Sequence, residues 1–176
     1  MQFQDTPLPD ARIVHMEPRL DERGFFARAF CTREFETAGL VSRMVQCNIS
    51  FNRHKGTLRG MHYQQMPAPE AKLVRCIRGA IYDVIVDMRP SSPTYLQHFG
   101  LELTADNRTA LYVPELFAHG YLTLTDDTEV FYQVSGFYTP SLEGGLRYDD
   151  PSLDIEWPTK AIHISDKDAG WPLITR

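Results

Sequence analysis

The sequence predicts an all-β protein, an antiparallel β-barrel of jelly-roll type with one or two short helices. Short apolar runs rich in β-branched and aromatic residues recur along the chain, with turn-forming residues between them. This pattern is typical of sandwiches and barrels. The length of 176 residues suits one domain, and no linker, repeat or low-complexity tract divides it. We therefore expect a single domain over residues 1–176.

The predicted elements follow from these runs and from the residues between them. Gly79 separates the first two clear strands, and Asp126-Asp127 predicts a tight hairpin between the last two. Only residues 32–38 look helical, with Thr32 as the N-cap and Gly39 as the stop signal. Residues 165–172 are expected to form a short turn or helical cap against the barrel. The clearest strands are residues 72–78, 80–88, 99–103, 109–113, 121–125 and 129–134.

The charge balance disfavours one broad class of partner. With 18 basic and 23 acidic residues, the chain has a formal net charge of -5, which argues against a general nucleic-acid binder. Local clusters of basic residues could still bind a phosphate, so the net charge does not exclude a small anionic ligand.

The cysteines and the N-terminus indicate a reducing compartment. Cys31, Cys47 and Cys76 are widely spaced and form no C-x-x-C pair, so neither a disulfide framework nor a zinc ribbon is predicted. The N-terminus has no basic stretch followed by an apolar run, and charges interrupt every later apolar run. We therefore expect no membrane partner and a cytoplasmic location.

Two isolated histidines are the first pointers to chemistry. His62 is followed two residues later by Gln64, where a metal-binding barrel would carry a second histidine, and His119 follows a strand farther along. The two segments have the layout of a cupin, a small barrel in which His-x-His, an acid and one later His bind a metal. Without the second His a typical three-His site cannot close. Isolated histidines suit proton transfer better than metal binding.

A series of motifs in order along the chain carries a more specific signal. The chain resembles the nucleotide-sugar 3,5-epimerases of the dTDP-4-dehydrorhamnose 3,5-epimerase type from about Pro7 to Leu173. The resemblance implies the cupin-like jelly roll and a reaction at carbons next to a sugar ketone. It rests on residues 23–26, 46–50, 56–64, 72–75, 117–120, 150–151 and 165–168, with Tyr132 and Tyr138.

The resemblance implies four catalytic residues. His62 matches the base that removes a proton beside the C4 ketone, and Asp168 matches the carboxylate that orients it. A neutral imidazole can do this work when one nitrogen faces the carbon acid and the other donates to a fixed acceptor. Tyr132 matches the acid that protonates the opposite face of the enolate, and Lys72 matches the cation that stabilises the enolate oxygen. Taken alone, each has a plainer interpretation: a structural strand histidine, a helix capping box of Ser165 with Asp168, a half-buried strand tyrosine and a solvated lysine.

The resemblance also implies a set of substrate-binding positions. Asp83, an acid within an apolar strand, must be paired if it is buried, and in the family it partners the histidine that matches His119. Arginines suit a diphosphate because the planar guanidinium donates two parallel hydrogen bonds. The implied positions are Arg23, Phe26, Arg28, Gln46, Asn48, Arg59, Asp83, His119, Tyr138, Glu143 and Lys167.

The chain departs from the family pattern at three places. Arg28 stands where the family usually has a Glu that helps to read the thymine ring, and arginine offers only donors. Glu70-Ala71 precedes Lys72 where Gln-Gly is usual, and Gly136 stands where Asp is common. The identity of the nucleobase is therefore left open.

The resemblance implies inversion at C3 and C5 of a nucleoside-diphospho-4-keto-6-deoxyhexose through an enolate. No metal or organic cofactor is expected, because the substrate's own ketone is the electron sink. The resemblance further implies a homodimer in which residues 23–28 reach the neighbour's site. The alternatives are an epimerase that inverts C3 alone, a catalytically idle cupin that binds a sugar nucleotide, and a metal cupin oxidase, which Gln64 disfavours.

Overall fold

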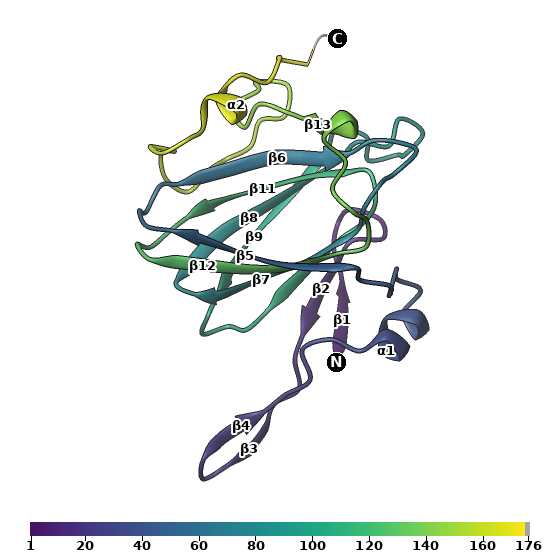
Figure 1. Cartoon of the computed structure of the whole chain (residues 1–176), viewed down its shortest axis with the longest axis vertical. Helices are drawn as coiled ribbons and strands as arrows, with labels where there is room; N and C mark the ends of the chain where they lie inside the picture. Colours follow the sequence, from purple (N-terminus) through teal and green to yellow (C-terminus); the bar gives the residue numbers. More distant parts are fainter. Residues whose placement is uncertain (175–176) are drawn as a thin grey trace.

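Two antiparallel sheets make up the body of the protein (Figure 1). The computed structural model describes residues 1–174. A separate two-stranded hairpin, β3 (Arg19–Asp21) with β4 (Gly24–Phe26), extends away from the body. The six-stranded sheet has the order β1 (Gln2–Asp5), β2 (Arg12–His15), β10 (Ala110–Val113), β7 (Lys72–Arg78), β12 (Thr128–Val134) and β5 (Gln46–Asn52). The five-stranded sheet has the order β13 (Glu143–Gly145), β6 (Leu58–Gln64), β11 (Phe117–Thr123), β8 (Ala80–Asp87) and β9 (His98–Thr104).

Helices are few and short. They are α1 (Thr32–Thr37), the 3₁₀ turn η1 (Pro140–Leu142) and α2 (Asp166–Ala169). The predicted N-cap is wrong by one residue: Cys31 occupies that position and makes no side-chain capping bond, while Thr32 begins the helix. Tertiary packing stabilises this helix, because Phe35 is fully buried. Intrinsic helix propensity contributes little to the stability of so short a helix.

The main core lies between the two sheets. It contains Val74 of β7 together with Ile81 and Ile85 of β8. Side chains alternate across a strand, so Lys72 shares the inward face with Val74, and Asp83 shares it with the two isoleucines. Polar residues of both sheets therefore point into the same interior.

The outer faces of the sheets are covered by the two ends of the chain. On the six-stranded sheet, Phe35 of α1 packs with Leu73. On the five-stranded sheet, Val84 packs with Leu146 and Leu153 of the C-terminal segment. The central strands β7, β8 and β11 are thus largely buried on both faces, which accounts for the long apolar runs that predicted them.

The predicted hairpin at Asp126-Asp127 is wrong. The strands on either side of it, β11 and β12, lie in different sheets, and so do β7 and β8. The connection from β7 to β8 and the connection from β11 to β12 each lead from one sheet to the other. A hydrogen bond joins the two connections, since Ala80 N donates to Thr125 Oγ1 over 3.1 Å. Gly79 has φ +77°, and a Cβ there would lie 2.5 Å from Thr125 Oγ1. Turn-forming residues end a strand but do not determine which sheet the next strand joins.

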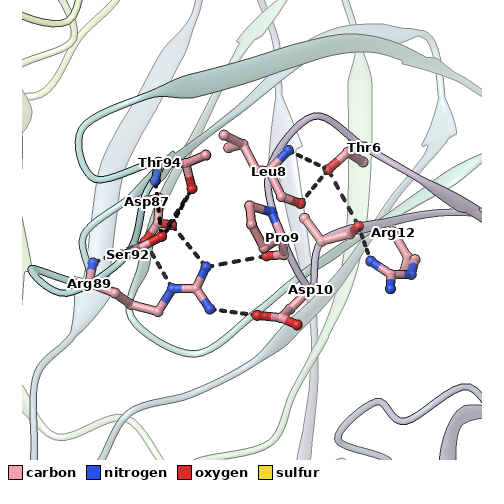
Figure 2. Close-up of polar contacts among 10 residues, drawn as sticks. Thr6, Leu8, Pro9, Asp10, Arg12, Asp87, Arg89, Ser92 and Thr94 are labelled. Carbon is pink, nitrogen blue, oxygen red and sulfur yellow. Dashed lines mark hydrogen bonds and ion pairs between the residues drawn. The ribbon is translucent and has the colours of Figure 1, made fainter.

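An ionic network around the buried Asp87 ties the loop between β1 and β2 to the end of β8 (Figure 2). Asp87 accepts from Arg89 Nη2 over 2.8 Å, from Ser92 Oγ over 2.6 Å and from Thr94 Oγ1 over 2.8 Å. The same guanidinium reaches Asp10 Oδ2 over 2.7 Å. Burial opposes ionisation of Asp87, but these donors outweigh it and lower its pKa to about 2.

No helix within residues 1–174 is both long and apolar enough to cross a membrane.

Candidate active site

A bulge in β6 brings two functional side chains to one face. His119 of β11 lies opposite His62, but two residues later Tyr121 lies opposite Arg59, three residues away on β6. In a regular strand, positions three apart point to opposite faces. The extra residue in β6 removes this conflict, and both Arg59 and His62 border one hollow in the interior.

The bulge depends on two facing glycines. Gly60 has φ +117°, and a Cβ there would lie 2.5 Å from Gly120 Cα. A Cβ on Gly120 would lie 2.8 Å from Arg59 O. Gly120 therefore sits inside a strand as a site of close backbone approach. The prediction that His119 follows a strand, and that the strand begins at Tyr121, is corrected: β11 starts at Phe117.

His62 and Asp168 form a dyad. His62 Nε2 lies 2.6 Å from Asp168 Oδ1, and Gly60 N donates to Asp168 Oδ2 over 3.3 Å. The Asp168 side chain is only 6% exposed, whereas that of His62 is 31% exposed. Burial alone would raise the pKa of Asp168, but the hydrogen bonds that it accepts from His62 and from Gly60 N–H hold it below its usual value. An ionised carboxylate only accepts, so His62 Nε2 is the donor and Nδ1 keeps its lone pair.

The helix α2 positions the carboxylate of this dyad. Ser165 is the N-cap, and its Oγ accepts from Asp168 N over 3.1 Å. The capping interpretation and the dyad therefore coexist: the backbone of Asp168 is capped while its carboxylate faces His62.

Lys72 and Tyr132 reach the same interior from the opposite sheet. In the strand register Tyr132 pairs with Val74 on one side and with Asn48 on the other. Lys72, Tyr132 and His62 all border two adjoining hollows, of about 420 Å³ and about 320 Å³. Burial raises the pKa of the Tyr132 phenol, Glu70 raises it further, and Arg59 opposes the shift. The phenol is therefore held in its protonated form.

A second histidine–carboxylate pair lies beside the first. His119 Nε2 lies 2.7 Å from Asp83 Oδ1, and the Asp83 side chain is fully buried. The expectation that a buried Asp83 must be paired is confirmed. The pair borders the smaller hollow through His119.

Arg59 is held by a residue that the sequence did not single out. Its Nε donates to Asn52 Oδ1 over 2.7 Å, and Asn52 is buried. Tyr121 OH also contacts Asn52 and lies 2.8 Å from Ser50 Oγ. Ser50 and Asn52 occupy alternate, inward-facing positions of β5, and Tyr121 contacts both from β11. The period-two pattern of β5 is the signal by which Ser50 and Asn52 could have been found.

Four of the predicted binding residues are linked by hydrogen bonds at the rim. Lys167 Nζ lies 2.6 Å from both carboxylate oxygens of Glu143, and Tyr138 OH donates to Glu143 Oε2 over 2.7 Å. Gln46 Oε1 accepts from Tyr138 N over 3.3 Å. The rim therefore joins β5, the segment before η1, β13 and α2.

The predicted binding residues of the hairpin are not brought to this cavity within one chain. Arg23 pairs with Asp21 over 2.6 Å, and Arg28 pairs with Glu34 over 2.6 Å. Phe26 is 73% exposed. Their role in binding remains a prediction.

Among residues 1–174, no three His, Cys, Asp or Glu side chains gather into a group that could hold a metal ion.

Comparisons with known proteins agree with this geometry. A family model described as dTDP-4-dehydrorhamnose 3,5-epimerase matches residues 5–176. The chain belongs to this family. A dTDP-4-dehydrorhamnose 3,5-epimerase of Shigella flexneri is 45% identical over 169 residues, which cover 96% of this chain and 93% of that protein. The predicted family is confirmed.

Solved structures of the epimerase family share the fold. The Bacillus anthracis dTDP-4-dehydrorhamnose 3,5-epimerase with TDP and PPi bound aligns with a TM-score of 0.95 at 40% identity, covering 98% of this chain and 99% of that one. A dTDP-6-deoxy-D-glucose-3,5-epimerase of Legionella pneumophila, in complex with dTDP-4-keto-L-rhamnose, aligns with a TM-score of 0.91 at 36% identity, covering 98% and 92%. The predicted all-β, antiparallel fold class is confirmed.

Two departures from the epimerase pattern lie against each other. A Cβ on Gly136 would be 3.2 Å from Glu70 Cβ and 3.6 Å from Gln64 Nε2. Glu70 and Gln64 both border the larger hollow. The sequence showed Glu70 only as an unusual loop residue, because its contact with a position far along the chain is set by the tertiary structure.

For the dyad of this epimerase-family protein, we expect Asp168→Asn to lower kcat by about 10²-fold, at the weaker end of acid–base effects. The amide oxygen can still accept from His62 Nε2, but the negative charge that stabilises an imidazolium is lost. Steady-state kinetics with a nucleotide sugar measure this effect. Asp166→Asn, an exposed neighbour in the same helix, serves as the control. A rate for Asp168→Asn equal to that of the control would contradict the dyad.

Proposed function

We propose that this protein inverts C3 and C5 of a nucleoside-diphospho-4-keto-6-deoxyhexose through an enolate, as the named activity of its relatives suggests. One observation carries the proposal: the His62–Asp168 dyad faces a cavity that Lys72 and Tyr132 enter from the other sheet. Inversion needs a base on one face of the enolate and an acid on the other. Groups on two facing sheets meet that need.

Each residue has a defined step. His62 Nδ1 takes the proton from the carbon next to the ketone, while Asp168 stabilises the imidazolium. The Lys72 ammonium stabilises the negative charge that develops on the ketone oxygen. Tyr132 OH donates its proton to the opposite face of the carbon, and the base and acid are then reset by proton exchange with water.

Isotope exchange tests the activity directly. The protein is incubated with dTDP-4-keto-6-deoxyglucose in deuterium oxide, and the deuterons incorporated at each carbon are counted. We expect deuterium at both C3 and C5 of the epimerised product. Deuterium at C3 alone would establish an epimerase that inverts one carbon. Absence of exchange on every nucleotide sugar tried would favour a binding module.

Activity is expected to be indifferent to metal removal. His62 and His119 each use Nε2 to contact a carboxylate, and the substrate's ketone supplies the electron sink. Assays before and after prolonged treatment with a chelator, with metal content measured in both samples, check this expectation. Chelator-sensitive activity that one specific metal restores would contradict it.

We further propose a homodimer in which the β3–β4 hairpin completes the partner's site. The hairpin exposes Leu20 (81%) and Phe26 (73%), and the edge strand β5 exposes Ile49 (65%). Exposed apolar side chains of this size on a projecting hairpin are typical of an interface. The role of Arg28 in reading the nucleobase depends on this arrangement. A cytoplasmic location remains a prediction.

Subunit complementation tests the exchange of hairpins. Arg23→Ala and His62→Ala are each expected to be nearly inactive, but subunits mixed by co-refolding should regain about a quarter of wild-type activity, because half of the dimers are mixed and carry one intact site of two. Two His62→Ala preparations mixed in the same way are the control. If each hairpin served its own chain's site, the mixed dimer would have no intact site and no activity would return.

A further inference from the structure

Glu70 is a largely buried acid in the wall of the cavity, and the proposed mechanism does not use it. It lies in the loop before β7, two residues from Lys72, and its side chain is only 10% exposed. It borders the larger hollow together with Lys72 and Tyr132. A carboxylate that is removed from water to this degree requires partners.

Its two carboxylate oxygens have different partners. Oε1 lies 3.2 Å from Lys72 Nζ, and the Lys72 side chain is also only 10% exposed. Oε2 accepts from Gln64 Nε2 over 3.3 Å. Lys72 Nζ further donates to His62 O over 3.4 Å. The ammonium is therefore held between the loop that carries Glu70 and the strand that carries the base.

Gln64 fixes the other side of Glu70. Its Nε2 also donates to Ala68 O over 3.2 Å and to Phe137 O over 3.2 Å, while its Oε1 accepts from Thr139 N over 2.6 Å. The residue that stands where a metal-binding cupin has its second histidine thus joins two loops. The amide is buried at 2% exposure, and the two hydrogens of Nε2 are shared among Ala68 O, Phe137 O and Glu70 Oε2. Gln64 therefore contacts Glu70 Oε2 while Glu70 Oε1 faces Lys72.

We propose that Glu70 is a positioning residue of the epimerase reaction: it holds the Lys72 ammonium where the enolate oxygen forms, and it places a negative charge in the wall of the hollow that Tyr132 also borders. The first part rests on the proposed function, whereas the electrostatic link to Tyr132 can be measured without substrate.

The charges around Tyr132 determine the direction of the expected change. Burial raises the Tyr132 pKa, Glu70 raises it further and Arg59 lowers it, and Lys72 and His62 border the same hollow. A general acid must be protonated, so a raised pKa extends activity to higher pH. Removing the Glu70 charge lowers the Tyr132 pKa, and the alkaline loss of activity then begins at lower pH.

Glu70→Gln removes the charge and preserves the shape of the side chain. Glutamine is the usual family residue here, but this chain lacks the acid that the family commonly has in place of Gly136, which lies against Glu70. In this chain the substitution therefore leaves the site without that negative charge. We expect kcat to fall by about tenfold to a hundredfold with KM nearly unchanged, because Lys72 acts on charge that develops in the transition state. Glu70→Asp, which keeps the charge on a shorter side chain, should recover part of the loss. The control is Glu102→Gln, which removes an exposed acid from β9. Circular dichroism verifies that each variant is folded.

Titration of tyrosines labelled with ¹³C at Cζ provides the independent measurement. The Tyr132 signal is assigned by its absence in Tyr132→Phe, and its midpoint should move to lower pH in Glu70→Gln but not in Glu102→Gln. An unmoved midpoint together with wild-type kcat in Glu70→Gln would overturn the inference. A moved midpoint in a protein that epimerises no nucleotide sugar would instead overturn the proposed function and leave the Glu70–Tyr132 link standing.

Discussion

Replacing His62 with alanine should abolish deuterium incorporation at both C3 and C5, lowering kcat by about 10⁴-fold, the upper end of general acid–base effects. The reason is geometric. Both His62 and His119 contact a carboxylate through Nε2, but the His62 side chain is 31% exposed towards the cavity, whereas that of His119 is only 11% exposed. No exchange is expected at either carbon because one base serves both of them.

The measurement is mass spectrometry and NMR of the sugar nucleotide after incubation in deuterium oxide. His98→Ala removes a histidine from the edge strand β9, outside the cavity, and should behave as wild type. Substantial exchange at C3 in His62→Ala would place the base elsewhere, with His119 as the next residue to vary. Loss at C5 alone would show that the two carbons use different bases.

Replacing Tyr132 with phenylalanine should separate proton removal from inversion. His62 can still form the enolate and return a deuteron to the face from which the proton came. We therefore expect deuterium in recovered substrate, with epimerised product reduced by at least about 10²-fold. The phenol is suited to donation because burial and Glu70 keep its pKa raised.

Tyr95→Phe, at an exposed position, is the matched control for the loss of one phenolic hydroxyl. The ratio of exchange to inversion, measured on one sample, distinguishes a missing acid from a damaged fold, because damage would lower both. Normal product formation by Tyr132→Phe would show that water or another group protonates the opposite face.

The sequence alone determined the fold class, the family and most of the residues at the site. Alternating and continuous apolar runs predicted the strands of the interior, because burial between two sheets dictates residue type locally. The motifs around His62, Lys72, Tyr132 and Asp168 identified side chains that the structure brings to one cavity. These signals are local in the chain, so they could be interpreted without coordinates.

Only the tertiary structure decided how those residues meet. Arg59 and His62 share a face because the backbones of Gly60 and Gly120 approach closely enough to form a bulge. The chain passes from one sheet to the other between β11 and β12, where a hairpin was predicted. The turn residues Asp126-Asp127 do not reveal which sheet the next strand joins. The contact of Glu70 with Gly136 joins positions far apart in the chain. The sheet that a strand joins and the contacts between loops depend on packing between segments that are distant in the chain, so a local pattern of residues does not determine them.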